Sequence, residues 1–136
     1  MKAKTLRRIY LREATVMLVA ARLAVRFVPA AQLFAWASRP PERIYRFAAD
    51  EVDRVSWAIE MISSKQWMNT SALPRALAAH AMLRRRGIGS RLCLGVAHER
   101  GGLVSHAWIE LGHKIILGGA ETARFTRLVA LGGEQT

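Results

Sequence analysis

The sequence predicts an α+β fold in which helices come first and a small antiparallel sheet follows. Apolar residues recur every three or four positions as far as Gly87, which is the period of an amphipathic helix. After Gly87 the period changes to two, which is typical of half-buried strands. The 136 residues, 51% of them hydrophobic and 23% charged, suffice for one globular domain with its own core. Helices that precede the strands, rather than alternating with them, indicate α+β.

Four helices are expected before Gly87. The first covers residues 4–28 and ends at Pro29, and a short one follows over 30–37. The third runs from about residue 42 to 63. The fourth spans 72–86: a hydroxyl residue at 70 or 71 can cap it, Pro74 lies in its first turn, and Gly87 follows its end.

Strands are expected over about 91–97, 103–111 and 114–117, with a short fourth strand over 125–131, joined as a meander. The predicted organisation is a single domain, 1–136, with a helical N-terminal part, 1–65, and a core, 66–136.

The net charge of +11 favours polyanions, acidic peptides or anionic membrane surfaces without choosing among them. Nucleic acid is not an expected partner, because no nucleic-acid motif or row of stackable aromatic residues accompanies the charge. The run from Arg84 to Arg86 is expected to close the fourth helix, at the negative end of its dipole. No transmembrane segment is expected, since the apolar run 14–21 is far shorter than a spanning helix. The single cysteine, Cys93, fits a reducing, cytoplasmic setting.

The first helix carries a second apolar row beside its main stripe: Val16, Val19, Leu23 and Phe27. Amphipathic helices usually bury their apolar residues, so core packing is expected for this row. If it is exposed, it becomes a candidate docking surface.

Two positions combine into a candidate cysteine-protease site. A cysteine at position 72 would begin a helix, whose dipole and unpaired N–H groups would stabilise its thiolate. His106 lies on a predicted strand that we expect to face this helix start, as a thiolate–imidazolium pair requires. A third group would hold the imidazole in one tautomer. The histidines and Cys93 have no zinc-ligand spacing, so neither a metal nor another cofactor is expected.

Four segments carry a family resemblance: LPRAL at 73–77, LRRRGI at 83–88, LGV at 94–96 and HAWIE at 106–110. In this order and spacing they resemble the B2 proteins of lasso-peptide biosynthesis, leader peptidases of the transglutaminase-like cysteine-protease superfamily. The motifs cover about residues 69–119, and the helical half is similar in pattern. The resemblance implies a transglutaminase-like, papain-like core and cleavage of a precursor peptide by a cysteine–histidine mechanism.

In that family a cysteine directly precedes the leucine of the helix motif, and here Ala72 occupies this nucleophile position. A methyl group is neither nucleophile nor base, so the chain as written is not expected to cleave peptides. An inactivated cysteine enzyme and a natural pseudoenzyme, acting as a binding scaffold, both remain open. Ser71 is a poor replacement, because it is rotated roughly 100° around the helix. Cys93 lies in mid-strand, without a helix dipole to activate it.

The resemblance makes His106 the catalytic base and places Trp108 beside it, as a shielding or substrate-binding residue. Many family members carry an aspartate on the strand after the histidine, and the equivalent position here is near Gly118. Glu121 is the candidate third catalytic member, with a backbone carbonyl as the alternative. Glu110 lies roughly 13 Å along the strand from His106 and is expected to be structural.

The resemblance also implies partners. These are the leader of the precursor peptide, a separate small B1 protein that binds the leader, and the ATP-dependent cyclase that closes the ring. The second apolar row of the first helix, if exposed, would receive the B1–leader complex or the cyclase.

Overall fold

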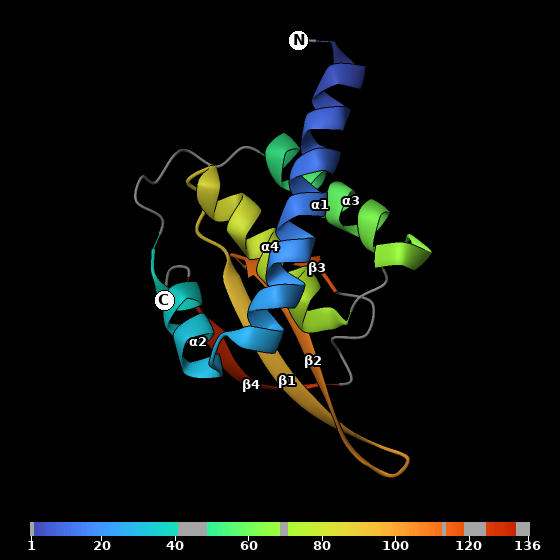
Figure 1. Ribbon diagram of the computed structural model, residues 1–136. Helices are drawn as coiled ribbons and strands as arrows, with labels where there is room; N and C mark the ends of the chain where they lie inside the picture. Colours follow the sequence, from blue (N-terminus) through green and yellow to red (C-terminus); the bar gives the residue numbers. More distant parts are fainter. Residues whose placement is uncertain (1, 41–48, 69–70, 113, 119–124, 133–136) are drawn as a thin grey trace.

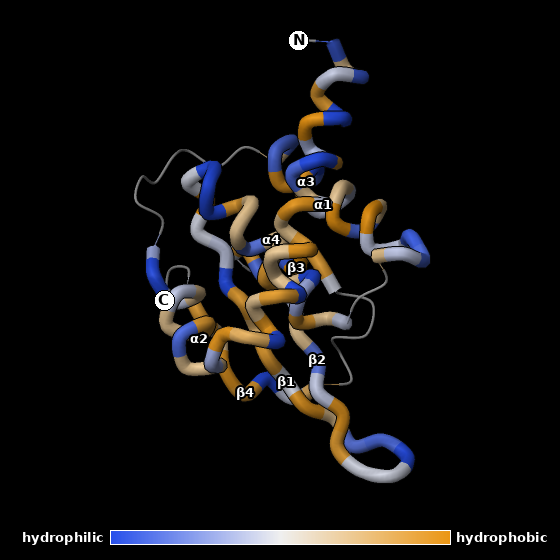
Figure 2. The backbone as a smooth tube through the Cα atoms, in the orientation of Figure 1, coloured by the Kyte–Doolittle hydropathy of each residue, from blue (hydrophilic) through white to orange (hydrophobic). Residues whose placement is uncertain are grey.

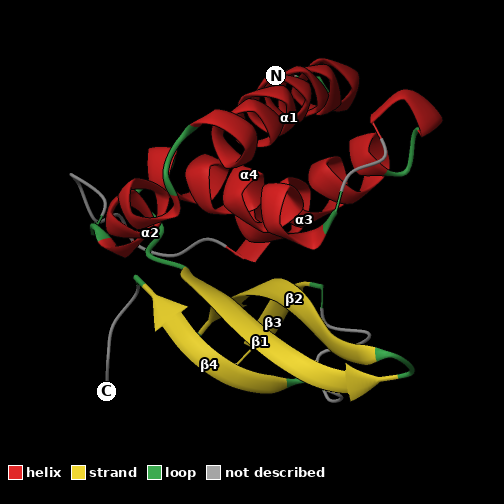
Figure 3. Cartoon of the chain, turned by 60° about the horizontal axis from the view of Figure 1, so that its bottom comes forward, coloured by secondary structure: helices red, strands yellow, loops and turns green. Residues whose placement is uncertain are grey.

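The chain forms two layers in the computed structural model, with helices on one side and a four-stranded antiparallel sheet on the other (Figure 3). The structure describes residues 2–40, 49–68, 71–112, 114–118 and 125–132. The helices are α1 (Ala3–Phe27), α2 (Ala30–Ser38), α3 (Ala49–Ser63), the short 3₁₀ helix η1 (Gln66–Met68) and α4 (Ala72–Arg85). The strands are β1 (Arg91–Glu99), β2 (Gly102–Leu111), β3 (Lys114–Leu117) and β4 (Thr126–Leu131). The α+β prediction is confirmed (Figure 1).

The predicted helices and strands agree with the observed ones closely, with one open boundary. The third helix was expected from about residue 42, and the structure describes it from Ala49, because residues 41–48 lie outside the described part. Gly87 follows the end of α4 with a φ of 74°, as expected for a left-handed residue beyond a helix.

The sheet order is β3-β2-β1-β4, so the meander prediction holds for three strands and is wrong for the fourth. β4 pairs antiparallel with β1, not with β3. In this register Leu131 lies opposite Leu92, and both side chains contact the helical core. The contact of Leu131 with the helical core therefore favours the β1 edge of the sheet for β4, and strand periodicity alone does not specify this edge.

The two faces of the sheet have different surroundings. Leu92, Ile109 and Leu117 point toward the helices and belong to the main core. Cys93 and Trp108 pair with each other on the opposite face and are buried there, outside that core. Since side chains alternate along a strand, every residue of β1 and β2 can be assigned to one face.

The helix α1 buries only one of its two apolar rows. Tyr10, Ala14, Leu18 and Ala21 face the core. The second row is exposed: Val16 by 62%, Val19 by 42%, Leu23 by 54% and Phe27 by 71%. The expected core packing of this row is therefore wrong, because α1 is the outermost helix and only its inner side meets α3 and α4 (Figure 3). Among the described residues, none of the helices has the length and apolar character needed to cross a membrane.

The helix α4 is enclosed by α1, α3 and the sheet (Figure 1). Eight of its 14 residues are buried. Three of these are the alanines at 76, 78 and 79, whose small side chains let neighbouring backbones come close.

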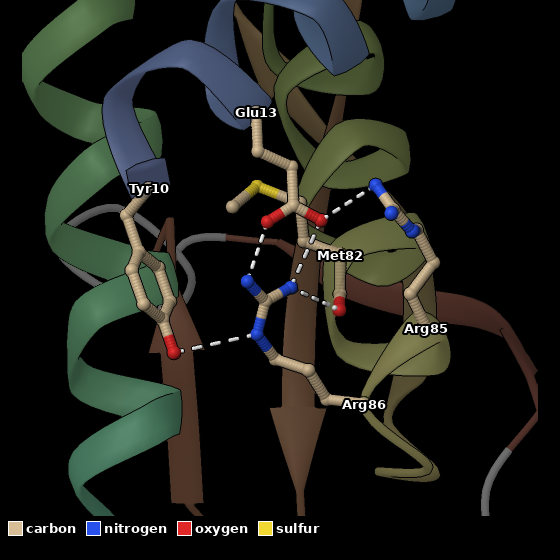
Figure 4. Close-up of polar contacts among 5 residues, drawn as sticks. All are labelled: Tyr10, Glu13, Met82, Arg85 and Arg86. Atoms are coloured by element: carbon tan, nitrogen blue, oxygen red, sulfur yellow. Dashed lines mark hydrogen bonds and ion pairs between the residues drawn. The ribbon is translucent and has the colours of Figure 1, made fainter. Parts of the chain in front are cut away.

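The arginine run at the end of α4 fastens it to α1 and α2. Arg86 forms an ion pair with Glu13 and donates to the Tyr10 hydroxyl at 3.4 Å (Figure 4). Arg85 reaches the same carboxylate at 2.9 Å. Burial acts to lower the pKa of Arg86, but the bonds to Glu13 and Tyr10 outweigh it and raise the pKa overall. Arg84 donates to the carbonyl oxygens of Trp36 and Arg39. The predicted role of the run at the helix end is confirmed.

A buried imidazole fastens the middle of α4. His80 Nε2 lies 2.9 Å from the Ala37 carbonyl oxygen, and Nδ1 lies 2.8 Å from Ser90 Oγ. A carbonyl only accepts, so Nε2 carries the hydrogen and Nδ1 of the neutral ring accepts from Ser90. Gly132 passes so close that a Cβ there would lie 2.7 Å from the Ala37 oxygen. His80 therefore connects α4 to α2 and to the start of β1.

We predict that Glu13→Gln destabilises the protein by about 2–4 kcal/mol, because it leaves the mostly buried Arg86 without its charge partner. Arg85→Ala is the control, because Arg85 is 61% exposed and its bond to the same carboxylate should contribute less than about 1 kcal/mol. Urea unfolding followed by circular dichroism measures both changes. Equal losses from the two variants would contradict the assignment of the stabilising contact to Arg86.

A second prediction concerns the loss of folding stability at acidic pH. Burial, opposed by the bond to Ala37 and aided by Arg84, lowers the pKa of His80 below its ordinary value. The unfolded chain therefore binds the proton more readily, and stability should be full above about pH 6.5, the ordinary pKa of histidine, and fall as the pH drops below it. His80→Gln should flatten this dependence, since an amide can donate to Ala37 but does not titrate. His98→Gln, at an exposed position, should leave the dependence unchanged. An unaltered pH profile in His80→Gln would assign the acid sensitivity to other groups.

Candidate active site

The nucleophile position begins α4. Ser71 is the N-cap residue with an extended backbone, and Ala72 is the first helical residue. The Ser71 hydroxyl makes no capping hydrogen bond, so the sequence was right about the boundary and wrong about that cap. The first N–H groups of a helix have no acceptor within it and attract negative charge. Ala72 presents only a half-buried methyl group to this site.

The imidazole of His106 is held by a carbonyl and two aromatic rings. Its Nε2 lies 3.2 Å from the Gly118 oxygen, and because a carbonyl only accepts, Nε2 is the donor. The ring stacks on Phe125 at 4.8 Å and on Trp108 at 6.0 Å between centroids. These contacts leave Nδ1 as the basic nitrogen of the neutral ring.

The resemblance led us to expect an acid near Gly118, and in the structure the Gly118 backbone supplies the acceptor for His106. Its φ is 79°, and a Cβ there would lie 3.2 Å from the Ala107 oxygen and 3.4 Å from His106 Nε2. Glycine is therefore required on both conformational and steric grounds. Glu121, the candidate third member, lies outside the described residues.

The strand register separates the two principal positions. His106 shares a face of β2 with Trp108 and Glu110, whereas Ala107 and Ile109 point into the helical core. Ala72 packs against that core. The described part of β3 pairs with residues 109–111 of β2. The described residues thus place the imidazole on the face of β2 opposite the core against which Ala72 packs, whereas the sequence led us to expect the histidine strand to face this helix start.

Trp108 is a buried support for His106. It is 2% exposed, and its indole N–H donates to Glu110 at 2.8 Å. Direct contact with substrate, which the sequence allowed for this residue, does not fit this burial, and we correct its role to packing.

Glu110 is the centre of a polar cluster on the same face. It accepts from Arg91 at 3.2 Å and from Arg127 at 3.3 Å. Burial alone would raise the pKa of Glu110, but the hydrogen bonds from Trp108 and Arg91 outweigh it and lower the pKa. Glu110 thus has a structural role, in which it joins three neighbouring side chains. This role was expected from its distance to His106 along the strand.

Cys93 is unsuited to act as a nucleophile. It is fully buried, and burial, reinforced by the negative charge of Glu110, raises the pKa of its thiol to about 11. At neutral pH the thiolate is therefore scarce. Among the described residues, no group of three or more His, Cys, Asp or Glu side chains is placed to hold a metal ion.

His80 is the residue that sequence reasoning undervalued. It was assigned no particular role from the sequence, but it is 3% exposed and makes two hydrogen bonds. Its place on the apolar side of the predicted fourth helix was the one signal of burial available in the sequence.

The comparisons with known proteins give one result. A family model described as the transglutaminase-like superfamily matches residues 14–130. Neither the curated proteins nor the solved structures include a match. The match runs from the middle of α1 to near the end of β4, and thus includes both the helix that begins at Ala72 and the strand that bears His106. The chain therefore belongs to the transglutaminase-like superfamily, whose members generally include cysteine peptidases.

Proposed function

We propose that this protein is a leader peptidase of lasso-peptide biosynthesis in a form whose nucleophile position is occupied by Ala72. The observation that carries the proposal is the location of Ala72 at the first residue of α4, in a chain of this superfamily. That location is where a helix terminus would lower the pKa of a cysteine. The order and spacing of the LPRAL, LRRRGI and HAWIE segments support the lasso-peptide member.

The proposed chemistry follows from the bond between His106 and Gly118. With Nε2 donating to the carbonyl, Nδ1 would exchange a proton with a thiol at position 72. The thiolate would attack the scissile carbonyl carbon, and the imidazolium would give its proton to the departing amine. Water would then hydrolyse the thioester, with His106 accepting a proton from it. The N–H groups of the first turn of α4 would stabilise the oxyanion.

The second candidate is a binding scaffold without catalysis. The methyl group at position 72 and the raised pKa of Cys93 favour it, because the chain as written has no thiolate for this reaction. In both cases the proposed partners are the leader of the precursor, a B1 leader-binding protein and the cyclase, in the cytoplasm.

The decisive experiment restores the nucleophile. Ala72→Cys should release the leader from precursor in the presence of the B1 protein and a reductant, as measured by mass spectrometry. Ala72→Ser is the matched control and should remain inactive, because an alkoxide is much harder to form than a thiolate. Absence of cleavage by Ala72→Cys, while precursor still binds, would contradict the peptidase proposal and favour the scaffold.

The base is tested in the Ala72→Cys background. His106→Ala should reduce the rate by about 10²–10⁴-fold, the usual contribution of a general acid–base. His98→Ala should retain activity, because His98 lies exposed near the β1–β2 turn. A similar loss in both variants, with unchanged circular dichroism, would show that His106 is not the base.

The chain as written should bind without cleaving. Removing one thiol eliminates the reaction and leaves the contact surface, so we expect a stable complex with precursor and B1. Its affinity should fall as salt rises, because the basic excess attracts acidic leader segments. Calorimetry over a salt series measures this. A folded chain that binds neither partner would contradict both candidate functions.

A further inference from the structure

We propose that the solvent-facing side of α1 docks on an anionic lipid bilayer. This outer face of α1 consists of Ile9, Val16, Val19, Leu23 and Phe27, with the arginines that flank them. The inference does not depend on the proposed function, and it assigns to this face a bilayer in place of the B1–leader complex or the cyclase that the sequence led us to expect there.

The apolar residues of the outer face form a ridge along one side of α1, with Arg12 between Ile9 and Val16. At 100° per residue, Ile9, Val16, Leu23 and Phe27 project within roughly 40° of one another, over roughly 27 Å of helix. They point away from the buried Ala14 and Leu18. Their exposed fractions range from 43% at Ile9 to 71% at Phe27. In Figure 2 the hydrophobic colour predominates from the middle of α1 to its C-terminal end. Adjacent exposed apolar side chains of this kind are uncommon on a surface that contacts only water, and they mark an interaction site.

The exposed charged side chains of α1 are all basic. Arg8, Arg12 and Arg26 are exposed and lie within or beside the ridge. The sole acidic residue of α1, Glu13, is engaged by Arg85 and Arg86 and does not neutralise them. The outer face of α1 thus combines apolar insertion with positive charge, the combination by which helices bind anionic membrane surfaces.

Shape and charge also discriminate among occupants. A second copy of the chain would bring arginines against arginines, so self-association is disfavoured. A protein partner would need a groove to receive a single convex helix. A bilayer needs none: acyl chains fill around any ridge, and α1 is the outermost element of the helical layer (Figure 3).

The test is flotation of the full chain with vesicles. We expect binding to vesicles that contain phosphatidylglycerol, weak binding to pure phosphatidylcholine, and release at about 1 M ionic strength, where the Debye length is about 3 Å. The double variant Leu23→Glu and Phe27→Glu should bind more than about tenfold more weakly, because it removes two insertions and adds two repelled charges.

The matched control is Leu103→Glu with Leu128→Glu. These leucines are 65% and 66% exposed and lie in the sheet, not in α1. Their replacement by glutamate changes the net charge by the same amount as the double variant in α1. The control should retain nearly all vesicle binding. Equal losses in the two double variants would reduce the effect to bulk charge and overturn the proposal. Failure of the unaltered, folded chain to float would overturn it as well, and would favour an acidic protein groove as the occupant. Circular dichroism of each variant confirms folding.

Discussion

The burial of α4 is the constraint on which the rest of the structure depends. A helix with the sheet on one side and α1 and α3 on others can have few large side chains, and three alanines meet this requirement. Its polar groups must be satisfied internally, because unpaired buried charges are costly. Arg84 and His80 bond to α2, and Arg86 bonds to α1. The contacts that satisfy these polar groups therefore also position α2 and α1 against α4.

The arginines at the end of α4 and in the strands are paired within the fold, so the basic composition does not by itself show where the protein presents positive charge. A run of three arginines suggests a polyanion site, yet in the fold all three are joined to acceptors on α1 or α2. Arg91 and Arg127 are joined to Glu110 on the outer side of the sheet. The arginines of the outer face of α1 are not paired with Glu13, the acidic residue nearest in sequence, because Glu13 already pairs with two arginines at the end of α4. Local pairing, and not the net charge, therefore decides where the protein presents positive potential.

The candidate site consists of two parts that the proposed cysteine–histidine mechanism would use, on two different elements. Position 72 has the helix terminus, and His106 has a fixed tautomer and two stacking rings. A backbone carbonyl at Gly118 takes the place of an acidic side chain. Such an acceptor orients the imidazole but carries no full negative charge to stabilise an imidazolium. In the proposed mechanism, His106 is therefore an oriented base, and position 72 lacks the thiol that this base would activate.

Local sequence determined the helices, the strands and the residue that begins α4, because periodicity, proline, glycine and helix-end chemistry act within a few residues. It also offered position 72 and His106 as the candidate catalytic positions on which the proposed function rests. Tertiary structure decided that β4 lies beside β1, that the row from Val16 to Phe27 is exposed, and that His80 is a structural link. It also decided that Gly118 supplies the acceptor and that His106 points away from the helical core. These outcomes depend on which distant surfaces meet, and a one-residue change in strand register would reverse the face on which a side chain lies.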